Sequence, residues 1–407
     1  MSYAAVPSPD PGPPPARRKR GRAVLWGGLA VTAVVVAATA VLLTGALAVG
    51  PTETTNAAQA LPGSVAGTGE TAGVGGTPGT SPSPGSQPGA SASASAAAKP
   101  PAAPPQQATP KGGWIPVDKA AWQRQVAAYQ ARKVDPVPGG VATIPEFRAD
   151  CTYSHRLADD PIVFPGLAGA SHMHSFFGNK AVDAGTTAGD LTRFTATTCK
   201  PVQDRSSYWV PTLYDAATKK PVEPTGFRVY YRSIRTNSTG MMPIPAGLRM
   251  IAGDAKKRVP TPRGAHGQFY CAFYGPGDLD GVARSGNGNW PICDPKSYAT
   301  LHYMLQYPDC WDGKNLDSPD HKKHVAYGTD KGCPASHPVR IPSLTFDITY
   351  GVKGTSQGYY LSSDPTGRTA SSMHGDAFLM WDQDAMNKRT KNCVLQRRQC
   401  DNDGYQN

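Results

Sequence analysis

Residues 343–350 read S-L-T-F-D-I-T-Y, and this stretch is the clearest indication of the fold in the chain. Its apolar positions alternate with Ser, Thr and Asp; they are Leu344, Phe346, Ile348 and Tyr350. Alternation with a period of two places the apolar side chains on one face of an extended strand. The stretch therefore predicts a β-strand with one face on a hydrophobic core.

The sequence around this strand contains further short segments of β-strand character. From about residue 151, short β-like runs are separated by Gly, Pro, Asn and Asp, and less regular runs occupy 208–214, 227–234 and 268–274. We find no βαβ alternation and no long amphipathic helix. Residues 151–407 are therefore predicted to form a mainly β domain, an antiparallel β-sandwich or a jelly-roll-like domain with long disulfide-pinned loops.

The cysteines support loops that are held by disulfides. All eight lie beyond residue 150, and they are Cys151, Cys199, Cys271, Cys293, Cys310, Cys333, Cys393 and Cys400. The number is even and no C-x-x-C occurs, so up to four disulfides in an oxidising compartment are favoured over a thiolate metal site. Four bridges allow 105 pairings. Pairing of each cysteine with its neighbour along the chain is the default, with Cys393–Cys400 the strongest pair.

The N-terminal part of the chain predicts a membrane anchor. Residues 23–50 contain no charge, and as a helix they are about 42 Å long, enough to span a hydrocarbon core of about 30 Å. Five positive charges in residues 17–22 favour a cytoplasmic tail, residues 1–22, and a C-terminal part outside the plasma membrane. The alternative is a signal peptide cut after A-L-A at 46–48, which would give a secreted protein.

Two further segments precede the β domain. Residues 51–112 have no aromatic residue and consist mostly of Pro, Ser, Ala, Thr and Gly, which predicts a disordered linker. Residues 113–150 form a lead-in with a short helix at 119–133, capped by Asp118. Residues 151–407 carry 29 Lys and Arg against 23 Asp and Glu without a dense basic run, so nucleic acid is not an expected partner.

The histidines carry the strongest chemical signal. The stretch G-A-S-H-M-H-S-F-F-G-N at 169–179 places His172 and His174 one residue apart, and H-G-D at 374–376 places His374 and Asp376 in the same spacing. On a strand each pair shares a face. The two pairs together would form an N/O ligand set for zinc or another divalent metal with an open position, or a catalytic group. The alternative is that these histidines only bond backbone carbonyls under a packed loop.

A second group of residues predicts carbohydrate binding. Aromatic rings mixed with polar groups are typical of sugar-binding clefts, although in a β-sandwich they more often fill the core. The candidate binding residues are Tyr208, Trp209, Tyr231, Arg232, Trp311, Asp312 and Asp317. For the aspartates, the alternative is a turn or a capping role in a loop.

Six motifs occur in a fixed order between about residues 155 and 395. They are D-D-P-I-V-F-P-G…S-H-M-H-S-F-F-G-N, D-R-S-S-Y-W-V-P, P-A-G-L-R-M-I-A-G-D, C-W-D-G-K-N-L-D-S-P-D-H-K-K-H, C-P-A-S-H-P-V-R-I-P and H-G-D-A-F-L-M-W-D. This order resembles the signature of the family of domains of unknown function numbered nineteen-ninety-six, found in secreted bacterial and fungal proteins. Ala377 departs from it, because a bulky aromatic residue is expected after H-G-D.

The resemblance implies an extracellular setting and, because some fungal members lie beside carbohydrate-binding modules, a polysaccharide context. It implies no catalytic residue. We therefore expect an anchored extracellular domain that acts on surface or environmental polysaccharide, with metal assistance from the His/Asp group. The alternatives are a non-catalytic module that binds glycan or the cell envelope, and a structural surface protein.

Overall fold

The computed structural model describes residues 113–235, 237–259, 261, 265–272, 283–284, 290–367 and 369–406. The predicted tail, membrane anchor and linker, residues 1–112, lie outside this part of the chain. Among the residues that the structure describes, no helix combines the length and the apolar character needed to cross a membrane.

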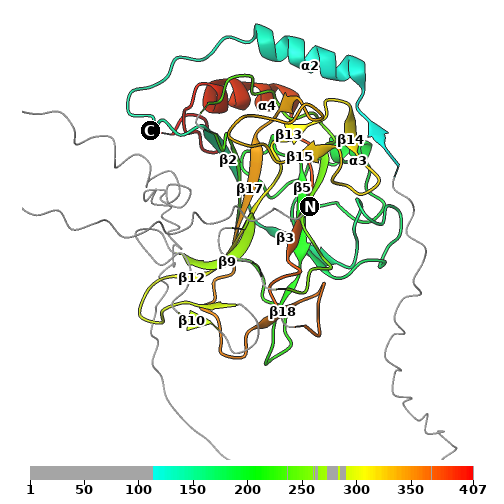
Figure 1. Ribbon diagram of the computed structural model, residues 1–407, viewed down its shortest axis with the longest axis vertical. Coiled ribbons are helices and arrows are strands. Elements are labelled where there is room, and N and C mark those ends of the chain that lie inside the picture. Colours follow the sequence, from blue (N-terminus) through cyan, green and yellow to red (C-terminus); the bar gives the residue numbers. More distant parts are fainter. Residues whose placement is uncertain are drawn as a thin grey trace, which may run out of the picture. The chain divides into compact units, whose positions relative to one another are not determined.

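Two five-stranded antiparallel sheets dominate the described chain (Figure 1). The first sheet has the order β2 (Glu146–Cys151), β7 (Gly226–Arg232), β17 (Ser343–Thr349), β12 (Thr300–Gln306), β9 (Gly267–Ala272). The second has the order β3 (Tyr153–Leu157), β4 (His174–Gly178), β5 (Ser207–Pro211), β19 (His374–Phe378), β8 (Arg249–Gly253). The prediction of a mainly β, antiparallel domain is confirmed, whereas the jelly-roll likeness stays a prediction.

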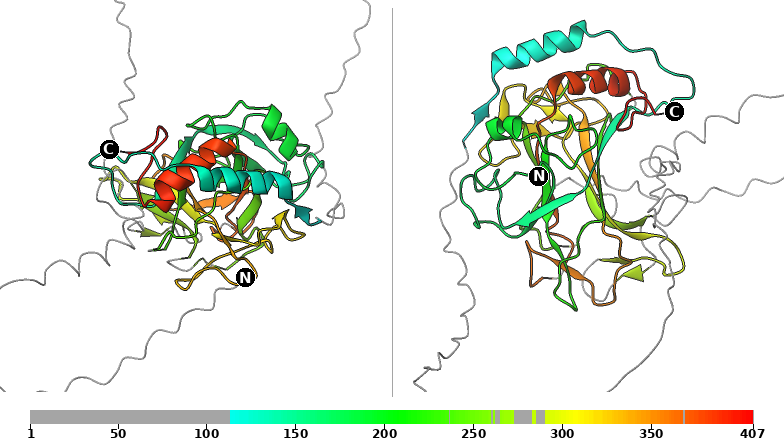
Figure 2. Two further views of the ribbon diagram at one scale, coloured as in Figure 1. Left: turned by 90° about the horizontal axis from the view of Figure 1, so that it is seen from above. Right: turned by 180° about the vertical axis from the view of Figure 1, so that it is seen from behind.

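Shorter elements surround these sheets. The small strands are β1 (Ile115–Pro116), β6 (Leu213–Asp215), β10 (Ala283–Arg284), β11 (Pro291–Ile292), β13 (Cys310–Trp311), β14 (Asn315–Asp317), β15 (Val325–Ala326), β16 (Val339–Arg340) and β18 (Tyr359–Leu361). The helices are α2 (Lys119–Ala131), α3 (Ala188–Arg193), α4 (Gln383–Arg389) and the π-helix η1 (Thr390–Leu395). Figure 2 shows α2 and α4 side by side, where Asn387 Nδ2 of α4 donates to the Gln125 carbonyl at 3.3 Å.

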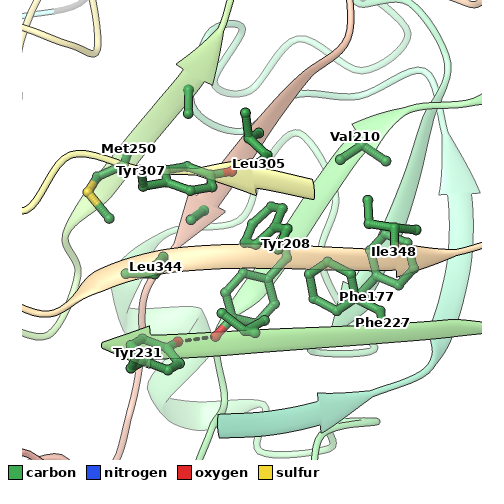
Figure 3. Packing of buried hydrophobic residues seen from close by; sticks show 14 of the residues in the cluster. Phe177, Tyr208, Val210, Phe227, Tyr231, Met250, Leu305, Tyr307, Leu344 and Ile348 are labelled. Carbon is green, nitrogen blue, oxygen red and sulfur yellow. Dashed lines mark hydrogen bonds between the residues drawn. The ribbon is translucent and has the colours of Figure 1, made fainter. Parts of the chain in front are cut away.

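The predicted strand at 343–350 is the central strand of the first sheet. Leu344, Phe346 and Ile348 are fully buried and face the inner side of the second sheet, as the period-two pattern predicts. Figure 3 shows Leu344 and Ile348 between the sheets, with Tyr208 and Val210 of β5 opposite them. Burial of each large apolar side chain contributes about 1.5–3 kcal/mol, so this shared core holds the two sheets together.

The predicted helix and disulfides are present. Helix α2 begins at Lys119, with the Asp118 side chain accepting from the Ala121 backbone N–H, and it ends two residues earlier than the expected 119–133. Each cysteine is bonded to its neighbour along the chain, in the pairs Cys151–Cys199, Cys271–Cys293, Cys310–Cys333 and Cys393–Cys400. The default pairing is therefore confirmed, and no described cysteine is free.

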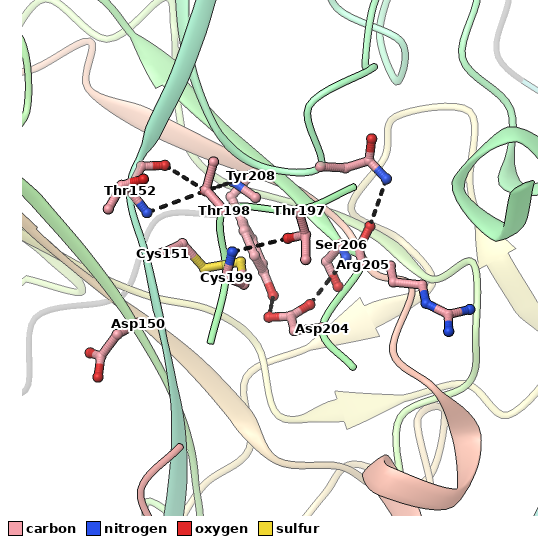
Figure 4. The surroundings of a disulfide bond; sticks show 12 residues. Asp150, Cys151, Thr152, Thr197, Thr198, Cys199, Asp204, Arg205, Ser206 and Tyr208 are labelled. Carbon is pink, nitrogen blue, oxygen red and sulfur yellow. Dashed lines mark hydrogen bonds between the residues drawn. A yellow bond between two sulfur atoms is a disulfide. The ribbon is translucent and has the colours of Figure 1, made fainter. Parts of the chain in front are cut away.

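A buried carboxylate lies beside the first disulfide (Figure 4). Asp204 accepts hydrogen bonds from the Tyr208 hydroxyl at 2.7 Å and from the Ser206 backbone N–H at 3.1 Å. The Tyr208 hydroxyl also contacts that of Tyr231, which accepts the indole N–H of Trp381 at 2.9 Å. Burial raises the pKa of Asp204 to about 6, because the ionised carboxylate is costly in a dry core.

The raised pKa of Asp204 predicts a measurable pH dependence. A carboxyl group whose pKa rises on folding stabilises the fold at low pH, and this contribution is lost as the pH rises from about 4 to about 6. A shift of about two units corresponds to about 3 kcal/mol. The Asp204→Asn variant stays neutral, so its unfolding free energy relative to the native chain should rise by about 2–3 kcal/mol between pH 4 and pH 7. Urea denaturation at both pH values measures this, with the exposed Asp403→Asn exchange as control.

Candidate functional site: a buried histidine and aspartate cluster

The predicted metal or catalytic residues lie on the outer face of the second sheet. Alternation along β5 turns Tyr208 and Val210 to the shared core and Trp209 outwards. The loop and helix between residues 158 and 193 cover this outer face. A second, smaller apolar cluster fills the space beneath them; it consists of Ile162, Phe176, Val182, Leu191, Trp209, Phe378 and Met380.

The strand register brings the two sequence pairs to the same place. Strands β4 and β19 both pair with β5, and Trp209 of β5 is opposite Phe176 on one side and Asp376 on the other. His174 shares the face of Phe176, and His374 shares the face of Asp376. His174, His374 and Asp376 therefore project from the outer face, separated only by the width of β5, whereas His172 precedes β4 and lies in the covering loop.

Close packing explains why glycine occupies the middle position of the H-G-D motif. A Cβ atom on Gly375 would lie 2.6 Å from the Tyr307 hydroxyl and 2.7 Å from Leu305 Cδ2, both on the inner side. The first sheet therefore packs directly against the backbone of β19 at this point. His374 and Asp376, on either side of Gly375, point the other way and are held by a strand that is closely packed from behind.

The three imidazole rings are in mutual contact. The ring centroids of His172 and His174 lie 4.2 Å apart, those of His172 and His374 5.0 Å, and those of His174 and His374 5.8 Å. One ring nitrogen from each of the three lies within 4.8 Å of the others. The structure thus answers the question that the sequence raised: the H-x-H pair faces His374.

Two carboxylates border the histidines. Asp376 Oδ2 lies 3.9 Å from His374 Nε2. Asp160, His174 and Asp376 form a second set whose potential ligand atoms lie within 4.8 Å of one another. His174 therefore belongs to both sets and lies at the centre of a cluster of three histidines and two aspartates.

Backbone carbonyls orient two of the histidines. His174 Nδ1 lies 2.9 Å from the carbonyl oxygen of Asp159, and His374 Nδ1 lies 2.8 Å from that of Ser372. A carbonyl oxygen can only accept, so each Nδ1 carries the proton and each Nε2 presents a lone pair. Histidines that bind metals are commonly held in this way by a second hydrogen bond.

The inward-facing atoms of the cluster lack hydrogen-bond partners. Within the described chain, His172 Nε2, His174 Nε2 and both carboxylate oxygens of Asp376 are buried without one. An unpaired buried polar group costs about 1–3 kcal/mol, and such groups in a native structure call for an explanation. Four of them in one cluster indicate donor atoms prepared for something that binds there.

The electrostatics of the cluster favour neutral groups. Burial lowers the pKa of His174 to about 3 and that of His374 to about 4, and it also lowers the pKa of His172. Burial raises the pKa of Asp160 to about 6, and burial together with the nearby Asp160 raises the pKa of Asp376 well above its usual range. The imidazoles are therefore neutral at pH 7, which is the form that binds metals.

Asp159 and Asp160 lie at the cluster, but the sequence did not indicate them as site residues. The Asp159 carboxylate accepts the backbone N–H groups of Gly169 at 2.7 Å and Ala184 at 3.0 Å, so it ties together the loop that covers the site. One oxygen of Asp160 accepts two backbone N–H groups, from Ile162 and Val163. The available signal was the D-D-P sequence in the same motif as the H-x-H pair.

The aspartate-rich and histidine-rich motif at 310–324 borders the same site. Lys322 Nζ donates to the carbonyl of Gly253 at 2.6 Å, and Gly253 is opposite His374 in the sheet. His324 bonds the Arg249 carbonyl at 2.6 Å through Nε2 and Ser318 through Nδ1. His321 and His324 therefore have their own partners, Asp317 and Ser318 respectively, and fix this loop against β8.

The cluster fits the requirements of a metal ion. Three ligands at about 2.0–2.1 Å from one metal in tetrahedral geometry lie about 3.4 Å from one another. Donor atoms within 4.8 Å of one another would therefore each move inwards by at most about 0.8 Å on a common metal. The neutral imidazoles, the adjoining carboxylates and the two backbone-oriented rings match the chemistry of an N/O metal site.

The predicted aromatic binding platform is corrected by the structure. The side chains of Tyr208, Trp209, Tyr231 and Trp311 are all fully buried. Tyr208 and Tyr231 lie in the shared core, Trp209 lies under the covering loop, and Trp311 packs edge-on against Trp122. These rings cannot stack on a glycan, because no face of them reaches the surface.

The predicted polar binding residues have local roles. Arg232 stacks over the Tyr230 ring at 4.9 Å. Asp312 accepts the backbone N–H groups of Lys314 and Asn315, so it forms the turn that was its alternative reading. The buried Asp317 accepts from the Ser318 backbone and pairs with His321 and Arg249.

Two surface pockets lie away from the cluster. One of about 980 Å³ is bordered by α4, η1 and the C-terminal residues, and one of about 420 Å³ is bordered by Arg235, Arg340 and the loop at 330–335. Neither includes a residue of the histidine and aspartate cluster. The cluster is thus a buried group of ligand atoms and not the floor of either pocket.

Fold and site together define a disulfide-bonded, antiparallel β domain with a buried His/Asp cluster under a covering loop. The chain belongs to the family described as "Domain of unknown function (DUF1996)", whose model matches residues 160–381, just over half of the chain. The resemblance that the six motifs indicated is thereby confirmed. No curated protein and no solved structure matches the chain.

Proposed function

We propose that this domain is a metal-dependent protein that acts on surface or environmental polysaccharide outside the cell. The observation that carries the proposal is the set of buried, unpaired donor atoms on His172, His174 and Asp376, beside His374. A purely structural cluster would pair these atoms with backbone groups, as His155 does with the Val182 carbonyl at 2.9 Å.

The ligand set narrows the class of metal. Three imidazoles and a carboxylate suit zinc or another divalent first-row transition metal. Thiolate ligation is excluded among the described residues, because every cysteine there is in a disulfide. The set Cys151, Cys199 and Asp204 is close in space, but its sulfur atoms are bonded to each other.

Each residue of the cluster would have its own role at the metal site. His174 and His374 would hold the ion through lone pairs whose direction the backbone fixes, and Asp376 would supply negative charge once metal binding releases its proton. Asp160 places a second carboxyl group beside Asp376. A divalent ion at this position supplies Lewis acidity towards a substrate oxygen.

The extracellular and polysaccharide parts of the proposal rest on other observations. Four disulfides are typical of an oxidising compartment outside the cytoplasm. The uncharged segment at 23–50 and the linker at 51–112 support an anchored domain held away from the membrane, with secretion after cleavage as the alternative. The glycan-binding alternative loses its aromatic platform, so metal-assisted action is the better supported of the two.

Metal analysis of the purified full chain tests the proposal. The native protein should contain about one divalent metal per chain by plasma mass spectrometry, and the His174→Ala/His374→Ala variant should contain none. His337→Ala is the matched control, because both ring nitrogens of His337 already have partners in Ser336 and Lys323. Native protein without metal after incubation with zinc, copper, manganese and iron would overturn the proposal.

A second measurement tests the polysaccharide part of the proposal separately from the metal site. The loaded native chain should release soluble sugars from isolated cell-envelope or plant polysaccharide, and a chelator or the double variant should abolish the release. Metal binding without release from any of these polymers would remove the polysaccharide part and leave the metal site.

A further inference from the structure

The three histidines of the cluster are not equivalent. His174 and His374 each donate Nδ1–H to a backbone carbonyl, whereas His172 makes no hydrogen bond with any residue that the structure describes. His172 therefore lacks the second contact that fixes the ring plane of a permanent metal ligand.

The three histidines also differ in where they lie along the backbone. His174 and His374 are the first residues of β4 and β19 and belong to the ladder of the second sheet. His172 lies two residues before β4, in the covering loop, between Ser171, whose N–H bonds the Ala158 carbonyl, and Met173. The loop backbone is held at both neighbours, but the His172 side chain is not.

His172 also differs from His174 and His374 in how deeply it is buried. His174 and Asp376 are fully buried and His374 is 4% exposed, whereas His172 is only partly buried. Its Nε2 is buried in the cluster, while the residue as a whole keeps some exposure to solvent. Among the cluster histidines, His172 is thus the one that a molecule from outside meets first.

This arrangement contains two histidines and one carboxylate as a fixed core. A set of two histidines and one carboxylate on one side of a metal leaves positions for exchangeable ligands, and metal sites that act on substrates keep such a position open. The ring of His172 lies beside this set, at 4.2 Å from His174 and 5.0 Å from His374 between ring centroids.

We infer that His172 is an exchangeable ligand that occupies the substrate position of the metal site until an incoming oxygen or nitrogen donor displaces it. His174, His374 and Asp376 are the permanent ligands. In the exchange the bond between the metal and His172 Nε2 breaks, and a bond from the metal to a lone pair of the incoming donor forms. No proton or electron is transferred, because His172 leaves as neutral imidazole. The inference rests on the proposed metal site.

The test uses cobalt(II) as a visible probe in the purified full chain. The His172→Ala variant should still bind one cobalt per chain, with an affinity about 10-fold below native, whereas His174→Ala should lose at least about 100-fold. Free imidazole at millimolar concentration should restore the native absorption spectrum to His172→Ala, because it fills the vacated position. His172→Gln, which keeps most of the side-chain volume, serves as the second variant.

The possible outcomes are distinct. Loss of cobalt from both His172 variants to the same extent as from His174→Ala would overturn the inference, since His172 would then be a permanent ligand. A native spectrum and affinity in both His172 variants, unchanged by imidazole, would also overturn it, since His172 would then not bind the metal. Failure of the native chain to bind cobalt or any other divalent metal would instead overturn the metal site itself.

Discussion

Replacing both His174 and His374 by alanine is expected to lower the affinity of the chain for a divalent metal by about 10,000-fold or more. Metal sites with four protein ligands bind with about 10–16 kcal/mol, or about 2.5–4 kcal/mol for each ligand. Two ligands therefore account for about 5–8 kcal/mol, and each 1.4 kcal/mol corresponds to a factor of ten. Backbone carbonyls orient both rings, so that each presents an Nε2 lone pair. Alanine at these two positions removes both lone pairs.

Competition with a chromophoric chelator at pH 7 measures this affinity for the native and variant chains. The His337→Ala control should remain within about threefold of native, because His337 only bonds Ser336 and the Lys323 carbonyl. A double variant that keeps an affinity within tenfold of native would show that the metal binds elsewhere. Circular dichroism with the native β signal is needed for each variant, so that loss of metal is not loss of fold.

Replacing Trp209 by alanine is expected to lower the free energy of unfolding by about 3–5 kcal/mol. Removal of a large buried aromatic ring costs this much, because the transfer energy is lost and a cavity remains. Trp209 is fully buried, stacks on Phe176 at 5.4 Å and packs against the loop that carries Ile162. The loss should be seen in urea denaturation with a chelator present, since bound metal would add its own stabilisation.

The control for this prediction is Tyr298→Ala, at an aromatic residue that is 89% exposed. Surface substitutions of this kind usually change stability by less than about 0.5 kcal/mol. If Trp209→Ala had an equally small effect while weakening binding to a glycan, Trp209 would be a surface platform, as the sequence suggested, and the description of the covered outer face would be contradicted.

Much of the fold was predictable because the relevant patterns are local. The alternation at 343–350 identified the central strand β17, and Asp118 identified the start of α2. Disulfide pairing was correct only as a default, since spacing alone leaves 105 arrangements open. The strand order of the two sheets was not predictable, because it depends on which distant segments pair.

The site was predictable in part from a period of two. His374 and Asp376 lie on one face of β19, as their spacing predicts, whereas the prediction that His172 shares a strand with His174 is wrong, because β4 begins at His174. The loop that carries His172 nevertheless brings its ring to those of His174 and His374. The missed residues, Asp159 and Asp160, precede a loop, and their positions depend on how that loop folds over the second sheet. The D-D-P sequence placed them in the same motif as the H-x-H pair, but no local pattern reports the contact itself.

The aromatic residues misled the sequence analysis for a physical reason. Strand β5, S-Y-W-V-P at 207–211, is buried on both faces, because the shared core covers one side and the 158–193 segment covers the other. A strand covered on both faces has no polar face, so rings and hydroxyl groups alternate without one side being exposed. Mixed aromatic and polar composition then resembles a binding surface although it is an interior.

X-ray absorption at the edge of the bound metal, recorded on the purified full chain, tests the central claim most directly. The account predicts a first shell of nitrogen and oxygen at about 2.0–2.1 Å, with outer-shell scattering from three imidazole rings in the native chain and from two in His172→Ala. A shell that contains sulfur, or only oxygen without imidazole scattering, would contradict it.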